Sequence, residues 1–209
     1  MRCGLATFEG CSLQKSNSSS ISGMARLRRT ITLVLGGARS GKSHYAQELA
    51  ARFPRAIFVA TARAVDAEMR RKIARHRQER PSNWKTIEAP VRLSGTIRSE
   101  SRHADVLVID CFTLYVSNAM RLSRNAEADN HKAIRELCDA IRASSASIIA
   151  VSNEVGSGIV PAFRSARVYR DLLGRLNQEV AAIADNVVLM VAGLPVHIKR
   201  SGRVMRRPA

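Results

Sequence analysis

The sequence predicts an α/β protein with a mainly parallel sheet and helices on both faces, and two observations support this. Apolar runs rich in Val, Ile and Leu alternate with segments of helical periodicity along the chain. These runs lack the apolar–polar alternation of a half-exposed strand, as expected where both faces of a sheet are covered. One run, residues 31–35, leads directly into the pattern Gly36-x-x-x-x-Gly41-Lys42-Ser43. Together they predict a P-loop NTPase fold of the RecA-like kind.

The order of the elements follows from this alternation. The expected strands are Thr32–Leu35, Ala56–Thr61, Lys85–Glu88, Val106–Asp110, Ser147–Asn153 and Asn186–Val191. The expected helices lie near Lys42–Arg52, Asp66–Arg80, Val91–Arg98, Thr113–Leu122, Ala128–Ser144 and Arg164–Ala184. A helix between successive strands is the connection that parallel strands require.

The chain is long enough for one domain with a sizeable core, which we place at residues 30–199. A Ser-rich, basic leader at residues 1–29 is expected to be disordered, and a basic tail at residues 200–209 to be flexible. The leader lacks the apolar stretch of a secretory signal, and no run approaches the length of a membrane span. The four cysteines lack a Cys-x-x-Cys spacing. We therefore expect a cytoplasmic protein without a membrane partner.

The formal net charge of +17 raises the alternative of a basic P-loop ATPase that binds nucleic acid. However, the basic residues are spread along the chain, and aromatic residues make up only 4% of it. Stacking platforms for single strands are therefore scarce, and we predict no nucleic-acid partner.

The P-loop predicts how a nucleotide is held. Its glycines let backbone N–H groups surround phosphate oxygens, and the helix that follows directs its positive end at the same anion. Lys42 adds a charge near the outer phosphates, and the Ser43 hydroxyl can bind Mg²⁺. The predicted cofactor-binding residues of this loop are Gly36, Gly37, Ala38, Arg39, Ser40, Gly41, Lys42 and Ser43.

A second element of this site is Asp110, which ends the apolar run Val106–Asp110. P-loop proteins place a carboxylate at such a strand end to hold Mg²⁺, directly or through water. We therefore predict Ser43 and Asp110 as the metal-binding pair.

The segment Asp66–Arg80 has an acidic first turn and then becomes strongly basic. Met69, Ile73 and His76 fall on one helical face at positions i, i+4 and i+7, with arginines beside them. This setting suits a histidine that attacks a nucleotide phosphorus. On the residues alone, a half-buried histidine on a charged helix is the simpler interpretation.

Several stretches together resemble one family. They are GGARSGKS at residues 36–43, FVATA at 58–62, RPSNWKTIE at 80–88, VIDC at 108–111, VSNEVGSGIVP at 151–161 and RDLLGRLNQ at 170–178. Over residues 31–199 the chain is similar to the bifunctional adenosylcobinamide kinase and adenosylcobinamide-phosphate guanylyltransferase family of cobalamin biosynthesis.

The resemblance implies an enzyme with two steps. Adenosylcobinamide is phosphorylated on its aminopropanol hydroxyl with ATP or GTP. GMP is then transferred from GTP through a covalent guanylyl-histidine, which gives adenosylcobinamide-GDP and pyrophosphate. The implied partners are adenosylcobinamide, its phosphate and the nucleotides, with Mg²⁺ as cofactor, and the family implies a homo-oligomer, a trimer. A single-activity small-molecule kinase that keeps the fold is the alternative.

The resemblance also implies the roles of individual residues. His76 is the implied nucleophile, and Lys42 is the second implied catalytic residue. Some relatives carry two adjacent histidines where this chain has Arg75 and His76, so a nucleophile at the first position would fall on Arg75. The further implied nucleotide-binding residues are Thr61, Ala62, Arg63, Arg77, Gln78, Glu79, Arg80, Glu88 and Asp110.

Glu154 and the Gly156-x-Gly158 loop follow an expected strand, at the edge where open α/β sheets bind ligands. Two interpretations stay open for them. They contact the corrinoid or belong to the catalytic loop, or they form a plain tight turn.

Overall fold

An eight-stranded sheet forms the centre of the computed structural model, which describes residues 28–78, 80–122 and 126–205. Its order is β3-β2-β4-β5-β1-β6-β7-β8. The strands are β1 (Ile31–Gly36), β2 (Ala56–Ala60), β3 (Lys85–Glu88), β4 (Val106–Asp110), β5 (Ser147–Val151), β6 (Asn186–Val191), β7 (Leu194–Arg200) and β8 (Arg203–Val204). Strands β1 to β6 pair in parallel, whereas β7 and β8 pair antiparallel. The prediction of a mainly parallel α/β sheet is confirmed.

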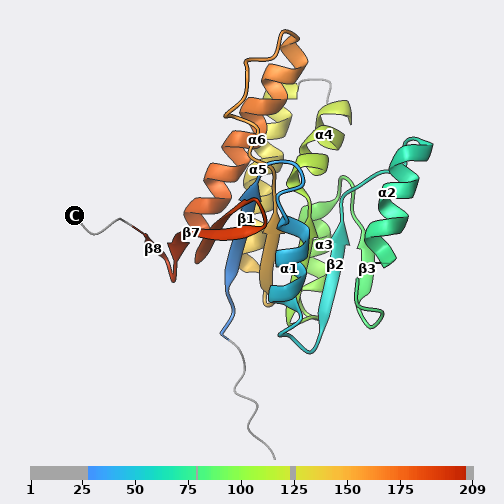
Figure 1. The fold of residues 1–209 in the computed structure, drawn as a ribbon, viewed down its shortest axis with the longest axis vertical. Helices are drawn as coiled ribbons and strands as arrows, with labels where there is room; N and C mark the ends of the chain where they lie inside the picture. Colours follow the sequence, from blue (N-terminus) through green and yellow to red (C-terminus); the bar gives the residue numbers. More distant parts are fainter. Residues whose placement is uncertain (1–27, 79, 123–125, 206–209) are drawn as a thin grey trace, which may run out of the picture.

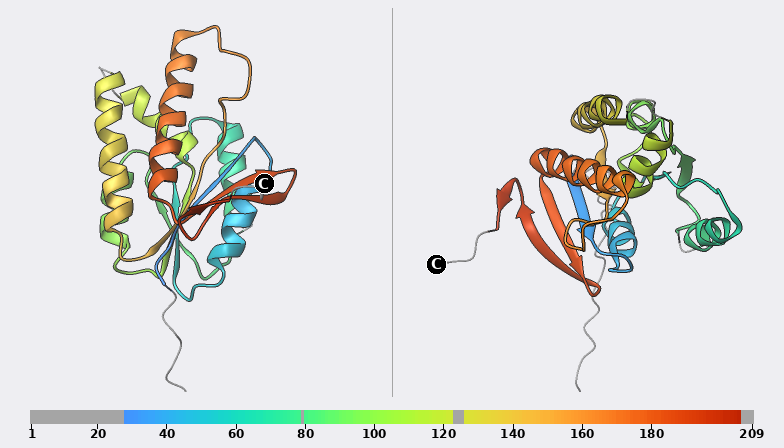
Figure 2. Two further views of the ribbon diagram at one scale, coloured as in Figure 1. Left: turned by 90° about the vertical axis from the view of Figure 1, so that its left-hand side faces the viewer. Right: turned by 90° about the horizontal axis from the view of Figure 1, so that it is seen from above.

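Helices cover both faces of this sheet, as expected. They are α1 (Lys42–Ala50), α2 (Ala67–Gln78), α3 (Leu93–Glu100), α4 (Phe112–Leu122), α5 (Ala126–Ala143) and α6 (Arg164–Ile183). Helix α1 lies on one face, and α3 to α6 form a layer on the other (Figure 2). Helix α2 stands apart beyond the β3 edge (Figure 1). None of the described helices is both long and apolar enough to cross a membrane.

The two layers explain why the strand sequences are apolar without alternation. Leu107 and Ile109 of β4 pack among α3 to α6, whereas Val106 and Val108 of the same strand pack on the side of α1. Each of these four side chains is fully buried. A strand that buries both of its faces needs apolar residues at every position.

The last hairpin, β7 and β8, was not predicted. Strand β7 follows β6 through a turn at Ala192–Gly193 (φ 51° and 83°), and the chain turns again at Ser201–Gly202 (φ 49° and 77°) into β8, which ends at Val204. The expected flexible tail at residues 200–209 therefore includes paired residues, since Arg203 pairs with Arg200. Residues 206–209, and residues 1–27 of the expected leader, lie outside the described residues. Edge strands with exposed side chains give a weak sequence signal, because no buried face imposes a pattern on them.

Two strands end earlier than predicted, which matters for the site. Strand β2 ends at Ala60 and β5 ends at Val151, so that Thr61 and Asn153 belong to the loops beyond them. The carboxyl ends of parallel strands lie at one edge of a sheet, where open α/β sheets bind ligands. The loops that leave these strands meet at that edge.

The buried core predicts a large difference between two leucines. Leu107→Ala removes a fully buried side chain from β4 and should lower the free energy of unfolding by about 2–5 kcal/mol. The matched change Leu122→Ala, at the exposed end of α4, should alter it by less than about 0.5 kcal/mol. Urea unfolding followed by circular dichroism measures both. Equal losses in the two variants would contradict the assigned core.

Candidate functional site

A pocket of about 890 Å³ opens at the edge where the parallel strands end. It lies between the P-loop, helix α2 and the residues that follow β2, β4 and β5. The predicted residues that line it are Ala38, Arg39, Ser40, Gly41, Lys42, Ser43, Ala62, His76, Arg80, Glu88 and Asp110. The P-loop, the Asp110 strand end and the α2 histidine thus share one cavity.

Two glycines give the P-loop its shape. Gly36 has φ 152°, and a Cβ there would stand 2.5 Å from Ser40 Oγ and 2.6 Å from the Met190 carbonyl oxygen. Gly41 has a left-handed conformation with φ 92° and caps α1, and no side chain hydrogen-bonds to the N-terminus of that helix. The first N–H groups of a helix lack partners within it. They are therefore directed at the pocket, where they can bind phosphate oxygens.

Lys42 is buried beneath this loop. Its ammonium donates hydrogen bonds to the Gly37 carbonyl oxygen and to Ser40 Oγ, the latter at 3.4 Å. Burial lowers the pKa of Lys42, while the neighbouring Cys111 and Asp110 oppose that shift. Hydrogen bonds to the P-loop therefore hold the Lys42 side chain in place. Phosphate oxygens can replace the Gly37 and Ser40 oxygens as acceptors when a nucleotide binds.

Asp110 is the acidic group around which the cations of the site gather. Burial raises the pKa of its carboxyl group, and a hydrogen bond donated by the Ser43 hydroxyl opposes this shift. The charges of His76, Arg80 and Lys42 oppose it as well. The predicted pair Ser43 and Asp110 is therefore in direct contact, and α2 brings His76 within electrostatic range of it.

The donor set fits a magnesium ion that takes most of its ligands from the substrate. Among residues 28–78, 80–122 and 126–205, no group of three or more His, Cys, Asp or Glu side chains could enclose a metal. The predicted pair supplies a hydroxyl from Ser43 and a carboxylate from Asp110. Mg²⁺ is commonly bound by one or two protein oxygens together with substrate phosphates and water.

Helix α2 turns its half-buried side to the pocket. Met69, Ile73 and His76 all line the cavity, so the predicted i, i+4, i+7 face is the one that faces the P-loop pocket. Just beyond α2, the Arg80 guanidinium lies 3.5 Å from the centroid of the Phe58 ring and donates to Thr86 Oγ1 at 3.3 Å. This cation–π contact fixes the position of a cation at the rim.

Other predicted residues stand away from the pocket lining. Arg63, Arg77 and Gln78 are exposed, and Glu79 lies outside the described residues. Gly36 and Gly37 shape the P-loop through contacts outside the pocket lining, Gly36 against Ser40 and Met190 and Gly37 by accepting a hydrogen bond from Lys42. Thr61 is fully buried, and its side chain bonds to backbone instead of facing the cavity.

Thr61 holds the backbone next to Asp110. Its hydroxyl donates to the Cys111 carbonyl oxygen at 2.7 Å and accepts from the Cys111 amide at 2.8 Å. Its own amide donates to the Asp110 carbonyl oxygen at 3.1 Å. Asn118 in turn donates to the Thr61 carbonyl oxygen at 2.8 Å. This network connects the end of β2 to the end of β4 and so positions the Asp110 carboxylate.

Sequence reasoning missed several lining residues. They are His44, Gln47, Ala60, Met69, Ile73, Arg75, Cys111, Leu114, Val151 and Asn153. The helical periodicity placed Met69 and Ile73 on the same face as His76, but it did not by itself predict that they line a pocket. Asn153 is held by Thr113 Oγ1, which accepts from its amide at 3.1 Å, and by Asn177 Nδ2, which donates to its carbonyl oxygen at 3.0 Å. Contacts between such distant residues leave no local pattern.

The fold and the pocket together define a nucleotide-binding P-loop protein. Solved structures agree on the fold. The chain is similar to a type III secretion system ATPase, with a TM-score of 0.50, 14% identity, and coverage of 85% of this chain and 59% of that chain. It is also similar to a protein of Pyrococcus horikoshii, with a TM-score of 0.51, 8% identity, and coverage of 86% and 94%.

The particular family follows from residues 32–198, which match the family model described as cobinamide kinase / cobinamide phosphate guanyltransferase. This chain belongs to that family, and the resemblance noted in the sequence is confirmed. The bifunctional adenosylcobalamin biosynthesis protein CobP of Pseudomonas aeruginosa is 42% identical over 168 residues, covering 80% of this chain and 96% of that protein. The bifunctional adenosylcobalamin biosynthesis protein CobU of Escherichia coli is 38% identical over 184 residues, covering 80% and 98%.

The Thr61 network predicts different outcomes for two substitutions. Thr61→Val keeps the shape but leaves the Cys111 amide and carbonyl without their partner, which should lower the free energy of unfolding by about 1–3 kcal/mol. Thr61→Ser keeps the hydroxyl and should lose less. Thermal or urea unfolding measures the difference, and equal losses in both variants would show that the hydroxyl bonds contribute nothing.

Proposed function

We propose that this chain performs both reactions of its family, cobinamide kinase and cobinamide-phosphate guanylyltransferase, at the pocket of the P-loop. One observation carries the proposal. Lys42 and Ser43 of the phosphate-binding half and His76 of α2 line the same cavity, with Asp110 between them. A triphosphate held by the P-loop would then present different phosphorus atoms to two nucleophiles.

In the kinase step, the aminopropanol hydroxyl of adenosylcobinamide attacks the γ-phosphorus of ATP or GTP. A new ester bond forms, the bond to the bridging oxygen of the nucleoside diphosphate breaks, and the hydroxyl proton passes to solvent water. Lys42 and the N-terminus of α1 stabilise the charge on the phosphates. Bound through Ser43 and Asp110, Mg²⁺ would neutralise part of the phosphate charge.

In the guanylyl step, an imidazole nitrogen of His76 attacks the α-phosphorus of GTP, and pyrophosphate leaves. A phosphate oxygen of adenosylcobinamide phosphate then attacks the guanylyl phosphorus. This forms adenosylcobinamide-GDP and releases His76 unchanged. Arg80 lies at the same rim, where its guanidinium can bind phosphate oxygens. The family description includes both activities, so it favours neither the single-activity kinase nor the nucleic-acid-binding ATPase.

The chain also carries a surface that supports the expected homo-oligomer. Val191 pairs with Leu194 and Leu189 pairs with Val196 across the β6–β7 hairpin, so these side chains share one face. Val191, Leu194 and Val196 are exposed by 52%, 68% and 49%. An exposed apolar cluster of this kind marks an interaction surface. We propose that copies of the chain associate through it, as a trimer.

If the guanylyl group is carried on His76, replacing this histidine should abolish guanylyl transfer but not kinase activity. Incubation of the wild-type protein with Mg²⁺ and GTP labelled at the α-phosphorus should label the protein, whereas label at the γ-phosphorus should not remain on it. His76→Ala should abolish the protein-bound label and guanylyl transfer, while kinase activity stays within about threefold of wild type, because the γ-phosphoryl transfer does not use the imidazole.

His103→Ala is the matched control, since His103 is exposed and is not one of the residues that line the pocket. It should leave labelling and both activities unchanged. Label that persists on His76→Ala at the wild-type level would overturn the role of His76. Equal loss of both activities would assign a structural role to this histidine instead.

The oligomer proposal predicts that a charge on the hairpin face separates the copies. Val196→Asp places a carboxylate on the apolar surface, where burial without a partner is unfavourable. Size-exclusion chromatography with light scattering should show a trimer for wild type and a smaller species for the variant. Lys199→Ala, on the same strand but bonded to the Ala181 and Ala182 carbonyls, should retain the wild-type mass. A monomeric wild type would contradict the proposal.

A further inference from the structure

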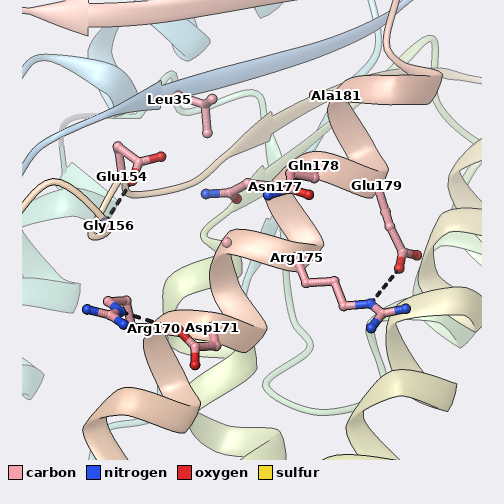
Figure 3. Close-up of a pocket in the computed structure, with 11 residues that line it drawn as sticks. Leu35, Glu154, Gly156, Arg170, Asp171, Arg175, Asn177, Gln178, Glu179 and Ala181 are labelled. Carbon is pink, nitrogen blue, oxygen red and sulfur yellow. Dashed lines mark hydrogen bonds and ion pairs between the residues drawn. The ribbon is translucent and has the colours of Figure 1, made fainter. Parts of the chain in front are cut away.

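A second pocket, of about 770 Å³, lies against helix α6 on the other side of the loop that follows β5 (Figure 3). Leu35 of β1, Glu154 and Gly156 line it from the sheet side, and α6 lines it with residues from Arg170 to Ala181. It adjoins the nucleotide pocket directly, because Asn153 lines the nucleotide pocket and Glu154, the next residue, lines this one. The proposed reactions leave it unused.

The partition between the two pockets is held from three sides. The Asn153 amide donates to Thr113 Oγ1 of α4 at 3.1 Å, and Asn177 Nδ2 of α6 donates to the Asn153 carbonyl oxygen at 3.0 Å. The Glu154 amide donates to the Gly36 carbonyl oxygen at the start of the P-loop at 3.1 Å. Only the peptide between Asn153 and Glu154, which these hydrogen bonds fix in place, would therefore separate a ligand in the second pocket from the nucleotide.

Gly174, in the interior of α6, is the observation that points to an occupant. It lines the pocket, and a Cβ built on it meets no atom within 4 Å. This glycine has no positive φ, unlike Gly36 and Gly41. Glycine inside a helix is unfavourable relative to alanine. Within the described chain, the one thing Gly174 provides is open space on the pocket side of the helix.

The polar groups of the pocket indicate what fits into this space. Arg170 is paired with Asp171 at 3.3 Å and Arg175 with Glu179 at 3.0 Å, while Glu154 accepts from the Gly156 amide at 2.7 Å (Figure 3). The lining thus contains two guanidinium groups and three carboxylates, and this excess of negative charge disfavours a polyphosphate. Both donors and acceptors remain available, because a guanidinium has five N–H groups and a carboxylate accepts more than one hydrogen bond. A neutral ligand with donors and acceptors of its own suits such a lining.

We propose that this pocket binds a carboxamide-bearing edge of the cobinamide acceptor, so that acceptor and nucleotide meet across the peptide between Asn153 and Glu154. A primary carboxamide supplies two N–H donors and a carbonyl acceptor without a net charge. The enzyme needs two substrates side by side, and the nucleotide pocket already has the features of a phosphate site. This inference rests on the proposed function only for the identity of the acceptor.

Filling the pocket tests the inference. Gly174→Leu should project a side chain into the open space without disturbing the α6 backbone, and Gly174→Ala is the matched small variant. Gly174→Leu should raise the KM for adenosylcobinamide about tenfold or more in the kinase assay and weaken its binding equally in equilibrium dialysis, read by corrinoid absorbance. Gly174→Ala should stay within about threefold of wild type. Gln178→Phe fills the same side of the helix one turn later and gives a second blocking variant.

The labelling of the protein by GTP without acceptor separates this inference from the proposed function. Both blocking variants should label as wild type does, because the nucleotide pocket is untouched. Unchanged acceptor KM and binding in both variants would overturn the inference. So would a change of oligomeric mass in light scattering, which would make the pocket an interface between copies. If the wild-type protein takes no label, the covalent step fails, while the dialysis result still decides where the acceptor binds.

Discussion

Burial of both faces of the central sheet is the constraint on which the rest of the structure depends. With α1 on one face and α3 to α6 on the other, side chains such as Leu107 and Val108 have no solvent on either side. Polar chemistry is then confined to the ends of the strands. Because the strands from β1 to β6 are parallel, their carboxyl ends lie at one edge of the sheet. The P-loop, Asp110 and Asn153 lie at or just after these strand ends.

The electrostatics of this edge are organised around the Asp110 carboxylate. Burial raises the pKa of Asp110, and Lys42, Arg80 and His76 counteract that shift together with the Ser43 hydroxyl. Thr61 holds the adjoining backbone without reaching the cavity. A nucleotide in the proposed position would therefore meet Lys42 and Arg80, whose positions are fixed by contacts already made in the protein. Such preorganisation lowers the reorganisation needed when charge develops on a phosphoryl group.

Much of the fold and part of the site could be predicted from local patterns. Strand positions, the P-loop, Asp110 and the α2 face with His76 all leave short-range signals, namely glycine spacing, a terminal carboxylate and helical periodicity. The roles of Thr61, Asn118 and Asn177 depend on partners between 24 and 57 residues away, which no local pattern encodes. The hairpin of β7 and β8 was missed because its exposed face imposes no periodicity. In the sequence, Gly174 is only a residue of low helix propensity, and the open space beside it is visible only in the structure.

The proposed mechanism requires that one bound GTP faces both the P-loop and His76. A crystal structure with Mg²⁺ and a non-hydrolysable GTP analogue tests this most directly. We expect the β- and γ-phosphates in the P-loop and an imidazole nitrogen of His76 about 3–3.5 Å from the α-phosphorus, opposite the leaving pyrophosphate. A triphosphate seated in the P-loop with its α-phosphorus screened from His76 by other residues, or a GTP bound outside this pocket, would contradict it.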